Sequence, residues 1–422
     1  MALEDKKSNR QGRSAVPPQY RRKRRWLKVL GIISVAVAIG AGVVFLAIPS
    51  LTALLEKPQE NPNTVASAPA KPQPDQVIHL VAGGDVNVTD NTIMSGRTEN
   101  GYDYSQCFRD ILPILSQGDL TLMNFEGLVG NSTYGTATKT APQQLLEALA
   151  NAGVDVLQTA NSCSIFDGLR GLQNTLQAVR SAGMTPVGTF ENNATFDSSG
   201  GYAIWEVQGI KVAVMGFTKG MDGMGLPAGS EQCVNLLYTD YNSTYQKVNT
   251  EGITQVVRNA AAHQPDLMVA MVHWGSEFND QISKSQDQIC RLLKSEGVDA
   301  IIGTHPHYVQ KMEFDEQAGT FVAYSLGDLF GDGEIAGTNY SVLLDLEITK
   351  DGTTGVTKVT GFSYVPVFIN KDDSGNLQVL RIKEAMEGYE NRFLGRVSEE
   401  TYLAMKSALE RIQSRTGVKL GG

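Results

Sequence analysis

Three of the five histidines in this 422-residue chain lie in two short segments that could bind a metal ion. One segment contains His273, and the other, with the sequence THPH, contains His305 and His307. Neutral imidazole is the commonest transition-metal ligand in proteins. Pro306 favours an extended conformation at the residue before it, and residues i and i+2 of an extended segment point to the same side. The spacing therefore predicts two imidazoles that converge on one ion; the alternative is a turn with two solvated histidines.

Carboxylates and other polar residues also follow apolar runs. Asp85 and Asn87 end the run VIHLVAGGDVN, and Asn124 and Glu126 end the run GDLTLMNFEG. The run GVDVLQTANSCSIFDG ends in a third polar cluster, which comprises Asn161, Ser162, Cys163 and Asp167. Each of these residues taken alone is compatible with an ordinary turn. Because a mixed set of imidazoles and carboxylates suits Zn, Mn or Fe, the residues together predict a metal-binding cleft.

The elements that must position these side chains can be predicted from the same runs. The runs are short and largely unbroken, which is typical of strands buried on both faces. Helical segments at 142–153, 170–183 and 283–297 lie between them, and each ends in glycine, as helices often do. This alternation predicts an α/β fold around a largely parallel sheet. Ligands of such folds bind beyond the carboxyl ends of the strands, where all the polar clusters fall.

The first 76 residues differ from the rest in composition. Residues 1–28 contain ten Lys or Arg against Glu4 and Asp5, a formal charge of +8, so residues 29–422 must carry −17 to give the net charge of −9. Residues 29–48 contain no charge and are long enough to span ~30 Å of hydrocarbon as a helix. This run exceeds the ~7–15 apolar residues of a cleaved signal peptide, which is the alternative. Residues 49–76 hold six of the fifteen prolines and predict an extended linker.

These segments predict a topology. Because basic residues precede the apolar run, we expect 1–28 to be a cytoplasmic tail, 29–48 to be a transmembrane anchor, and the remainder to be extracytoplasmic at the cell membrane. The basic run beside the anchor predicts contact with anionic lipid, and the acidic remainder argues against a nucleic-acid partner. Four widely spaced cysteines, with no CxxC pair, allow disulfides outside the membrane but predict no pairing; they are Cys107, Cys163, Cys233 and Cys290.

The chain resembles a known family through the ordered segments GGDVN, NFEG, TAPQQLLEALANAGVDVLQTANSCSIFDGL, TPVGTF, VHWGSEF, IIGTHPHYVQ and YSLGDLF. They are similar to the bacterial capsule-synthesis protein CapA family, of poly-γ-glutamate capsule biosynthesis, within the metallophosphoesterase-like superfamily. The resemblance covers about residues 78–330. It implies a four-layer α-β-β-α sandwich, here preceded by one transmembrane helix. It also implies an extracytoplasmic domain that works with a poly-γ-glutamate ligase and export machinery, or with another anionic surface polymer.

The resemblance also implies roles for individual residues. It implies a divalent metal, one or two ions, and it makes metal ligands of Asp85, Glu126, His273, His305 and His307. The chain departs from the family pattern at ANSCSIFDG, where Asn161 is kept but Ser162 replaces a ligand asparagine and Cys163 replaces a histidine that assists the leaving group. A milder change is Asp328, where the family usually has Asn.

Together these features predict a domain over 77–395 and a C-terminal helix and tail over 396–422. Within the latter, 398–415 predicts a helix with Ser398 as its N-cap, which either packs on the domain or meets a partner. Residues 340–370 alternate with period 2 and predict strands that complete a second sheet. The predicted function is a membrane-anchored capsule-synthesis accessory protein with a metal-binding cleft and weak or no hydrolase activity. The alternatives are an active cell-surface metal-dependent phosphoesterase or polymer hydrolase, and a purely structural module.

Overall fold

The computed structural model describes residues 73–130, 133–392 and 397–418. The predicted cytoplasmic tail, the transmembrane anchor over 29–48 and nearly all of the linker lie outside these residues. Among the described residues, none of the helices combines the length and the apolar character needed to cross a bilayer. The first strand begins at Gln76, next to the predicted start of the domain at residue 77.

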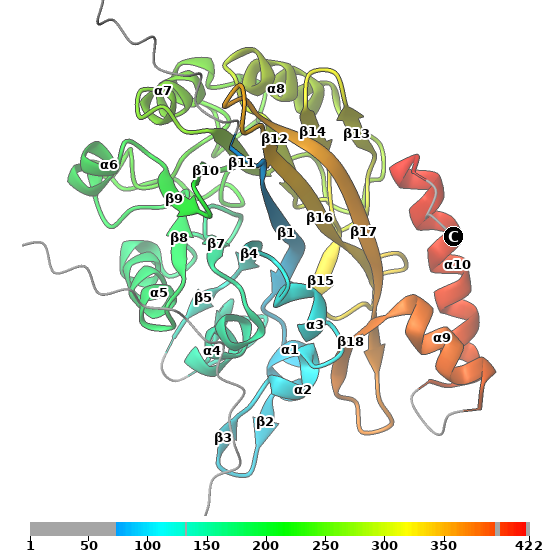
Figure 1. The fold of residues 1–422 in the computed structure, drawn as a ribbon. Helices are drawn as coiled ribbons and strands as arrows, with labels where there is room; N and C mark the ends of the chain where they lie inside the picture. The colour runs from blue at the N-terminus through cyan, green and yellow to red at the C-terminus, as the bar shows by residue number, and fades with distance from the viewer. Residues whose placement is uncertain (1–72, 131–132, 393–396, 419–422) are drawn as a thin grey trace, which may run out of the picture. The chain divides into compact units, whose positions relative to one another are not determined.

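The first sheet has eight strands, and those of one half run parallel to one another (Figure 1). Its order is β18 (Leu377–Arg381), β17 (Thr357–Lys371), β16 (Tyr340–Lys350), β1 (Gln76–Asn87), β4 (Leu120–Glu126), β7 (Val156–Gln158) and β8 (Thr185–Val187), and β15 (Asp328–Phe330) pairs with the end of β1. Strands β1, β4, β7 and β8 are parallel, whereas β16, β17 and β18 are antiparallel to their neighbours.

The second sheet has six strands, and its four central strands run parallel. Its order is β13 (Met312–Asp315), β14 (Thr320–Ala323), β12 (Ala300–Thr304), β11 (Leu267–His273), β10 (Ile210–Thr218) and β9 (Ala203–Val207). The edge strands β13 and β9 are antiparallel to their neighbours. Both sheets are therefore mixed, and the predicted largely parallel arrangement is correct only for one half of the first sheet and for the centre of the second.

Residues 340–370 form strands β16 and β17, as predicted, but they do not complete the second sheet. Strand β16 pairs with β1 along seven residues, from Gln76 opposite Lys350 to Ala82 opposite Leu344. The prediction of a place in the second sheet was therefore wrong. The physical reason is that period-2 alternation identifies a strand with a buried face but does not identify the strand beside it.

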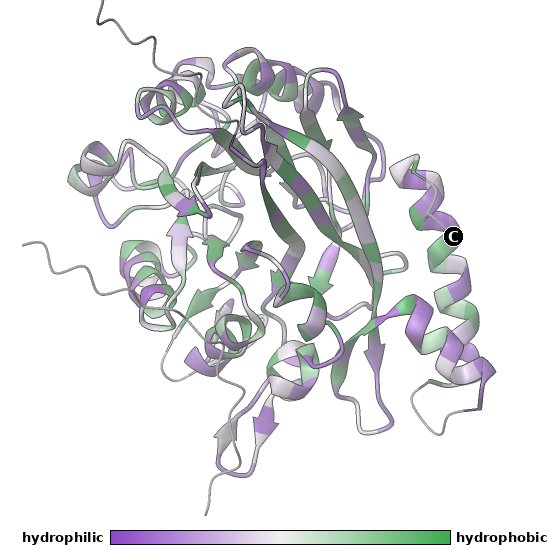
Figure 2. Ribbon diagram, viewed as in Figure 1, coloured by the Kyte–Doolittle hydropathy of each residue, from purple (hydrophilic) through white to green (hydrophobic). Residues whose placement is uncertain are grey.

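Three clusters of buried apolar residues form layers of core, and Figure 2 marks hydrophobic residues in green along the ribbon. Leu80 and Leu122 of the first sheet belong to the same buried cluster as Val214 and Val269 of the second, so this core lies between the sheets. The other face of the first sheet packs on α4 (Gln143–Ala152) and α5 (Gly168–Ser181). The other face of the second sheet packs on α7 (Thr250–Ala261) and α8 (Lys284–Ser295). The layers are therefore helix, sheet, sheet, helix.

The helices predicted at 142–153, 170–183 and 283–297 are confirmed as α4, α5 and α8. Helix α4 ends at Gly153, whose φ of 110° is readily adopted only by glycine. The smaller elements are α1 (Asp90–Ser95), β2 (Arg97–Thr98), β3 (Gly101–Tyr102), α2 (Ser105–Phe108), α3 (Leu112–Leu115), β5 (Leu128–Val129), β6 (Thr140–Ala141) and α6 (Asn193–Ser199).

The C-terminal helices cover the far end of the first sheet (Figure 1). Helix α9 (Ile382–Glu390) is followed by α10 (Glu399–Thr416), whose N-cap is Ser398, as predicted. The buried face of α10 contributes Met405 and Ile412 to the core between the sheets. The helix therefore packs on the domain, which decides between the two alternatives left open by the sequence. All four cysteines are buried and free.

Four aspartates join neighbouring parallel strands at the ends opposite the polar clusters. Each one immediately precedes a strand and accepts a hydrogen bond, at 2.7 to 3.0 Å, from a backbone N–H of the strand beside it. The pairs are Asp119 with His79, Asp155 with Thr121, Asp266 with Lys211, and Asp299 with Met268. In each pair the aspartate's own N–H donates to the carbonyl of the same partner residue. Two bonds thus tie each pair of strands together.

Candidate metal centre

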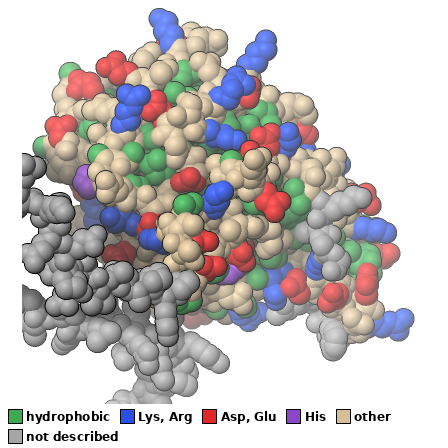
Figure 3. Space-filling model, turned by 45° about the horizontal axis from the view of Figure 1, so that its top comes forward, with side chains coloured by type: hydrophobic (Ala, Val, Ile, Leu, Met, Phe, Trp, Pro, Cys, Tyr) green, Lys and Arg blue, Asp and Glu red, His purple; other side chains and the backbone are tan. Residues whose placement is uncertain are grey.

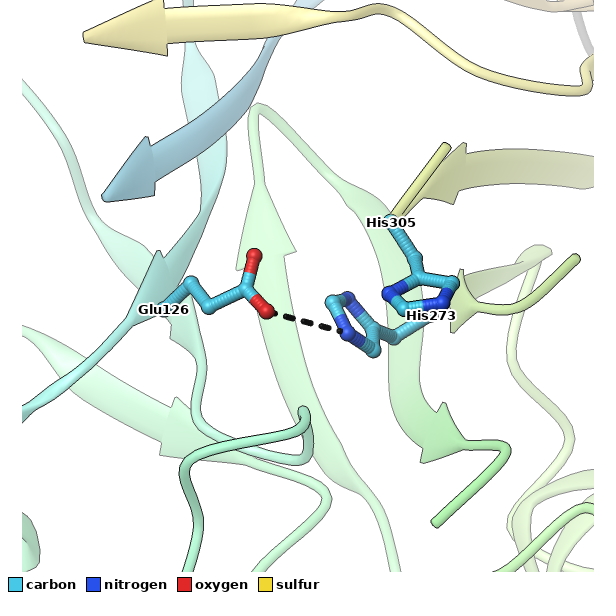
Figure 4. Close-up of side chains that lie close together, drawn as sticks. All are labelled: Glu126, His273 and His305. Atoms are coloured by element: carbon cyan, nitrogen blue, oxygen red, sulfur yellow. Dashed lines mark ion pairs between the residues drawn. The ribbon is translucent and has the colours of Figure 1, made fainter. Parts of the chain in front are cut away.

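The five predicted ligands come together where the central strands of the two sheets end. Asp85 lies near the end of β1, Glu126 ends β4 and His273 ends β11, while His305 and His307 follow β12. Figure 4 shows Glu126 of the first sheet pointing toward the two histidines of the second. Among the described residues, three groups of side chains could each hold a metal ion, and within each group the possible ligand atoms lie within 4.8 Å of one another. The groups are Glu126 with His273 and His305, Glu277 with His305 and His307, and Asp85 with His307 and Asp328.

His273 is fully buried between polar partners from both sheets. Its Nε2 lies 3.4 Å from Glu126 Oε1 and accepts a hydrogen bond from the Ser162 backbone N–H at 3.3 Å. Its Nδ1 lies 3.2 Å from Thr304 Oγ1. The imidazole of His273 and the carboxylate of Glu126 therefore face each other.

Two buried polar atoms of the cluster have no hydrogen-bond partner among the described residues: Glu126 Oε2 and His305 Nδ1. Buried polar atoms are nearly always hydrogen bonded, so unpaired ones at a cleft indicate a missing ligand. Burial raises the pKa of Glu126, but the neighbouring His273 outweighs burial, and the net pKa is lowered to about 2. A buried, ionised carboxylate with a free oxygen beside imidazoles fits a divalent cation.

Asp85 is held in place by a hydrogen bond on each carboxylate oxygen. Asn124 Nδ2 donates to Oδ1 at 2.5 Å, and the His305 backbone N–H donates to Oδ2 at 3.0 Å. Burial and then the charge of Glu126 raise the pKa of Asp85 to about 7. A cation bound beside Asp85 would favour the ionised form of this carboxylate.

His307 is paired with Asp328, a residue that the sequence identified only as a departure from the family pattern. His307 Nδ1 lies 2.7 Å from Asp328 Oδ1 and 3.9 Å from Asp85 Oδ2. Burial lowers the pKa of His307, but Asp328 outweighs burial and the net pKa lies well above its ordinary value. Asp328 reaches the cluster because β15 pairs with β1 and sets it opposite Asp85. A three-residue strand carries too little pattern to predict that pairing.

The two histidines of THPH converge by a different route from the predicted one. His305 has φ of 91° and His307 has φ of 58°, so the segment is bent and not extended, and the prediction of an extended conformation was wrong. Their ring centroids lie 6.0 Å apart. Positive φ at a non-glycine residue costs ~1–3 kcal/mol and persists only where the surroundings impose it. Here the bond from the His305 N–H to Asp85 contributes to imposing it.

The segment ANSC, residues 160–163, forms hydrogen bonds with residues of the cluster and with the strand next to it. Asn161 Nδ2 donates to Asn124 Oδ1 at 3.3 Å and to the Phe125 carbonyl at 2.6 Å, while its Oδ1 accepts from the Cys163 N–H at 3.0 Å. Ser162 Oγ lies 3.2 Å from His273 Nε2. Burial and then the charge of Glu126 raise the pKa of the Cys163 thiol well above its ordinary value.

Asp167 is the one predicted cleft residue that the structure places elsewhere. It precedes α5, is exposed, and forms an ion pair with Arg170 at 3.5 Å. The turns between Ser162 and Asp167 carry the chain away from the strand ends. Asp167 lines a different hollow, together with Phe166.

A cleft of about 360 Å³ opens onto the cluster and has a predominantly acidic wall. Its charged lining residues are Glu126, Lys139, Asp222, Glu277, His307, Asp328, Asp332 and Glu334, and Asn87, Ser162 and Cys163 also line it. The aromatic ring of Phe278 lies at its mouth and stacks on His307, with centroids 5.4 Å apart.

Lys219 is a further residue of the cluster that the sequence reasoning missed. It follows β10, and its Nζ donates to the Gly275 carbonyl at 3.1 Å and lies 3.2 Å from His305 Nε2. Burial, and then the charges of His273 and Lys219, lower the pKa of His305 well below its ordinary value, so this ring is neutral. The end of β10 is a further polar strand end, since FTKG follows an apolar run, and this signal could have located Lys219.

Two mixed sheets flanked by helices, with buried carboxylates and imidazoles at their strand ends, define an α/β sandwich with a candidate metal centre. The family model of the bacterial capsule synthesis protein PGA_cap matches residues 79–332, more than half of the chain. The chain belongs to this family.

Known relatives are similar over most of their length. The capsule biosynthesis protein CapA of Bacillus anthracis is 28% identical over 321 residues, which cover 74% of this chain and 73% of that protein. The PGA biosynthesis protein CapA of Bacillus subtilis strain 168 is 26% identical over 284 residues, covering 65% and 70%. These relatives support a role in capsule biosynthesis.

Similar solved structures include phosphoesterases. A calcineurin-like phosphoesterase from Bacillus subtilis is 17% identical, with a TM-score of 0.40, and the match covers 79% of this chain and 99% of that one. A phosphatase from Mycoplasma pneumoniae is 14% identical, with a TM-score of 0.41, and the match covers 69% and 94%.

Proposed function

We propose that this protein is a membrane-anchored accessory protein of capsule synthesis whose extracytoplasmic domain binds a divalent metal ion and has weak or no hydrolase activity. The observation that carries the proposal is the buried cluster at the strand ends, in which Glu126 Oε2 has no partner among the described residues. Membership of the capsule synthesis family supports the biological role. The basic tail at 1–28 and the uncharged run at 29–48 support the anchor.

The residues that would hold one or two ions are those whose donor atoms gather in the cleft: Asp85, Glu126, His273, His305, His307 and Asp328. Mixed nitrogen and oxygen donors suit Mn, Zn or Fe. A bound ion would act as a Lewis acid toward anionic oxygen atoms of a ligand. The protein's own contribution is orientation, since Asn124 and the His305 N–H hold both oxygens of Asp85.

Two features support weak rather than efficient hydrolysis. General acid catalysis requires a group that can release a proton near the working pH. Because burial raises the pKa of the Cys163 thiol far above that range, this thiol is a poor proton donor for a leaving group. Ser162 turns both its N–H and its hydroxyl toward His273, so it holds that ring and offers no amide oxygen to a second ion.

The charge of the protein supports a metal-mediated contact with an anionic polymer. Residues 29–422 carry −17, and the cleft wall is itself predominantly acidic. Figure 3 shows acidic and basic side chains interspersed over the face that it draws, so the described residues of that face form no continuous basic patch. A polyanion such as poly-γ-glutamate would be repelled at long range, and we infer that a bound cation mediates its contact with the cleft. A polymer ligase and its export machinery are the expected partners.

The test is the metal content of the full-length protein, purified in detergent without chelators and measured by elemental mass spectrometry. We expect about one equivalent of metal, and its loss in a His305→Ala/His307→Ala variant. Absence of metal from both proteins after Zn or Mn is supplied would exclude the metal-binding part. Deletion of the gene should reduce surface polymer, and unchanged output would exclude the capsule role.

The second candidate is an active metal-dependent phosphoesterase or polymer hydrolase of the cell surface. The observation that favours it is the cleft of about 360 Å³, which opens directly onto the cluster and has room for a phosphodiester. Metal-dependent hydrolysis of bis-p-nitrophenyl phosphate, abolished by His305→Ala, would support this function. Lack of turnover with every divalent metal tried would exclude that activity.

A further inference from the structure

Arg415 lies in the last turn of α10 and contacts the two loops that follow strands β11 and β12. Its Nη2 lies 3.1 Å from Asp280 Oδ2, and its Cζ lies 4.7 Å from the centre of the Tyr308 ring. Asp280 belongs to the loop after His273, and Tyr308 directly follows His307. The guanidinium therefore bridges two loops that come from different strands of the second sheet.

These two loops, 274–283 and 304–310, are also joined to each other. The Phe278 N–H donates to the Pro306 carbonyl at 2.9 Å, and Gln310 Nε2 donates to the Asn279 carbonyl at 2.8 Å. The Phe278 ring stacks on His307 with an interplanar angle of 25°. A displacement of either loop would therefore move His307.

Several observations indicate that Arg415 fixes this geometry. Its side chain is only 15% exposed, and its Nη1 has no hydrogen-bond partner among the described residues. A buried guanidinium is expensive unless it is paired, so its interactions with Asp280 and Tyr308 are close to obligatory. His307, next to Tyr308, has positive φ, a conformation that persists only when neighbours impose it.

We propose that Arg415 is a positioning residue, which holds the two loops together and so sets His307 against the rest of the candidate metal centre. The family match ends at residue 332, so this contact comes from a helix outside the matched region. Helix α10 thereby becomes part of the support of the site. The effect on metal affinity rests on the proposed metal binding, whereas the effect on the loops does not.

The test compares Arg415→Ala with Arg411→Ala, a matched change at an exposed position on the same helix, in the full-length protein in detergent. Hydrogen–deuterium exchange of the metal-free proteins, read by mass spectrometry, should increase at 275–282 and 304–310 in Arg415→Ala only. Zinc affinity should fall ~10-fold or more, the usual effect of losing an outer support of a ligand. Arg415→Lys keeps the charge but not the planar face, and should restore only part of both effects.

Each outcome decides a separate point. Faster exchange confined to the two loops supports the proposal even if the wild-type protein binds no zinc, a result that would count only against the proposed metal binding. Unchanged exchange at both loops would overturn the proposal. Faster exchange throughout the domain would also overturn it, because Arg415 would then contribute to general stability and not to the position of His307.

Discussion

The backbone N–H of His305 donates a 3.0 Å hydrogen bond to Asp85 Oδ2, although 220 positions separate the two residues in the sequence. Asp85 belongs to the first sheet, and His305 follows a strand of the second. This bond connects the two sheets at the cleft and fixes the orientation of a carboxylate that is a candidate metal ligand.

Replacement of Asp85 by alanine should reduce both stability and metal binding. The change leaves the His305 N–H and Asn124 Nδ2 buried without their acceptor. Each unpaired buried donor costs ~1–3 kcal/mol, and we expect a net loss of about 2–3 kcal/mol because repulsion with Glu126 is relieved. Urea denaturation of the metal-free protein measures this loss, with Asp85→Asn, which keeps one acceptor oxygen, as the control. Equal stability of wild type and Asp85→Ala would contradict the prediction.

Replacement of Lys219 by glutamine should strengthen metal binding. The Lys219 ammonium lies 3.2 Å from His305 Nε2, where its positive charge would repel that of a metal ion bound to the ring. A unit charge a few ångströms away contributes ~1–4 kcal/mol at the effective dielectric constant of a partly buried site, so affinity should rise at least ~10-fold. The amide of glutamine can still donate to the Gly275 carbonyl. Titration calorimetry measures the change, and weaker binding would show that the ammonium supports the site.

Asp299 should make stability depend on pH at a point far from the cleft. Burial raises its pKa to about 6 in the folded protein, and the ordinary value applies on unfolding. A raised carboxyl pKa means that the folded state binds the proton more tightly, so this residue's contribution to stability increases as pH falls from about 6 to about 4. At pH 7.5, Asp299→Asn should therefore be more stable than wild type, by up to ~2 kcal/mol, and the advantage should vanish near pH 4.

The control for this prediction is Asp119→Asn, in which the same change is made to the equivalent hydrogen bond of the first sheet. It measures how much the exchange of a carboxylate acceptor for an amide costs at such a strand end. Thermal unfolding at pH 4 and pH 7.5 gives both comparisons. If the difference in stability between wild type and Asp299→Asn did not change with pH, the pKa of Asp299 would be the same in the folded and the unfolded protein, and the prediction would be wrong.

Gly84 should tolerate no side chain, because the backbone immediately before β15 passes too close. A Cβ at Gly84 would lie 1.8 Å from the Gly327 carbonyl oxygen, which also accepts a 3.0 Å hydrogen bond from the Asp85 N–H. Gly84→Ala should cost about 3 kcal/mol or more, since backbone atoms must separate. In Gly388→Ala, by contrast, the new Cβ meets nothing within 4 Å in helix α9 and should stabilise by up to ~1 kcal/mol. Chemical denaturation of both variants checks the pair.

The sequence predicted much of the site because its signals are local. A polar residue directly after an apolar run marks a strand end, and this rule located Asp85, Glu126 and His273. Helix signals were equally local. The glycine predicted to end α4 adopts a left-handed conformation, and the serine predicted to begin α10 is its N-cap. The helix–sheet–sheet–helix order and the candidate ligands were expected from the resemblance to a known family.

The remaining features depend on contacts between distant segments. Asp328 enters the cluster through the pairing of β15 with β1, and Arg415 reaches the site from a helix that begins more than ninety positions after THPH. The bend at His305 cannot be deduced from Pro306, because the bond to Asp85 outweighs the local preference for extended backbone. Asp167 lies near the polar cluster in sequence but is carried away by turns.

The four aspartates that precede strands β4, β7, β11 and β12 have a consequence for errors in folding. Since side chains alternate along a strand, a slip of one residue would turn Glu126 or His273 away from the cleft and toward the helices. The same slip would separate each carboxylate from the backbone N–H that it accepts and leave that group unpaired. These aspartates therefore destabilise misregistered pairing at the amino ends of the parallel strands. The correct placement of the candidate ligands at the carboxyl ends of the same strands depends on that effect.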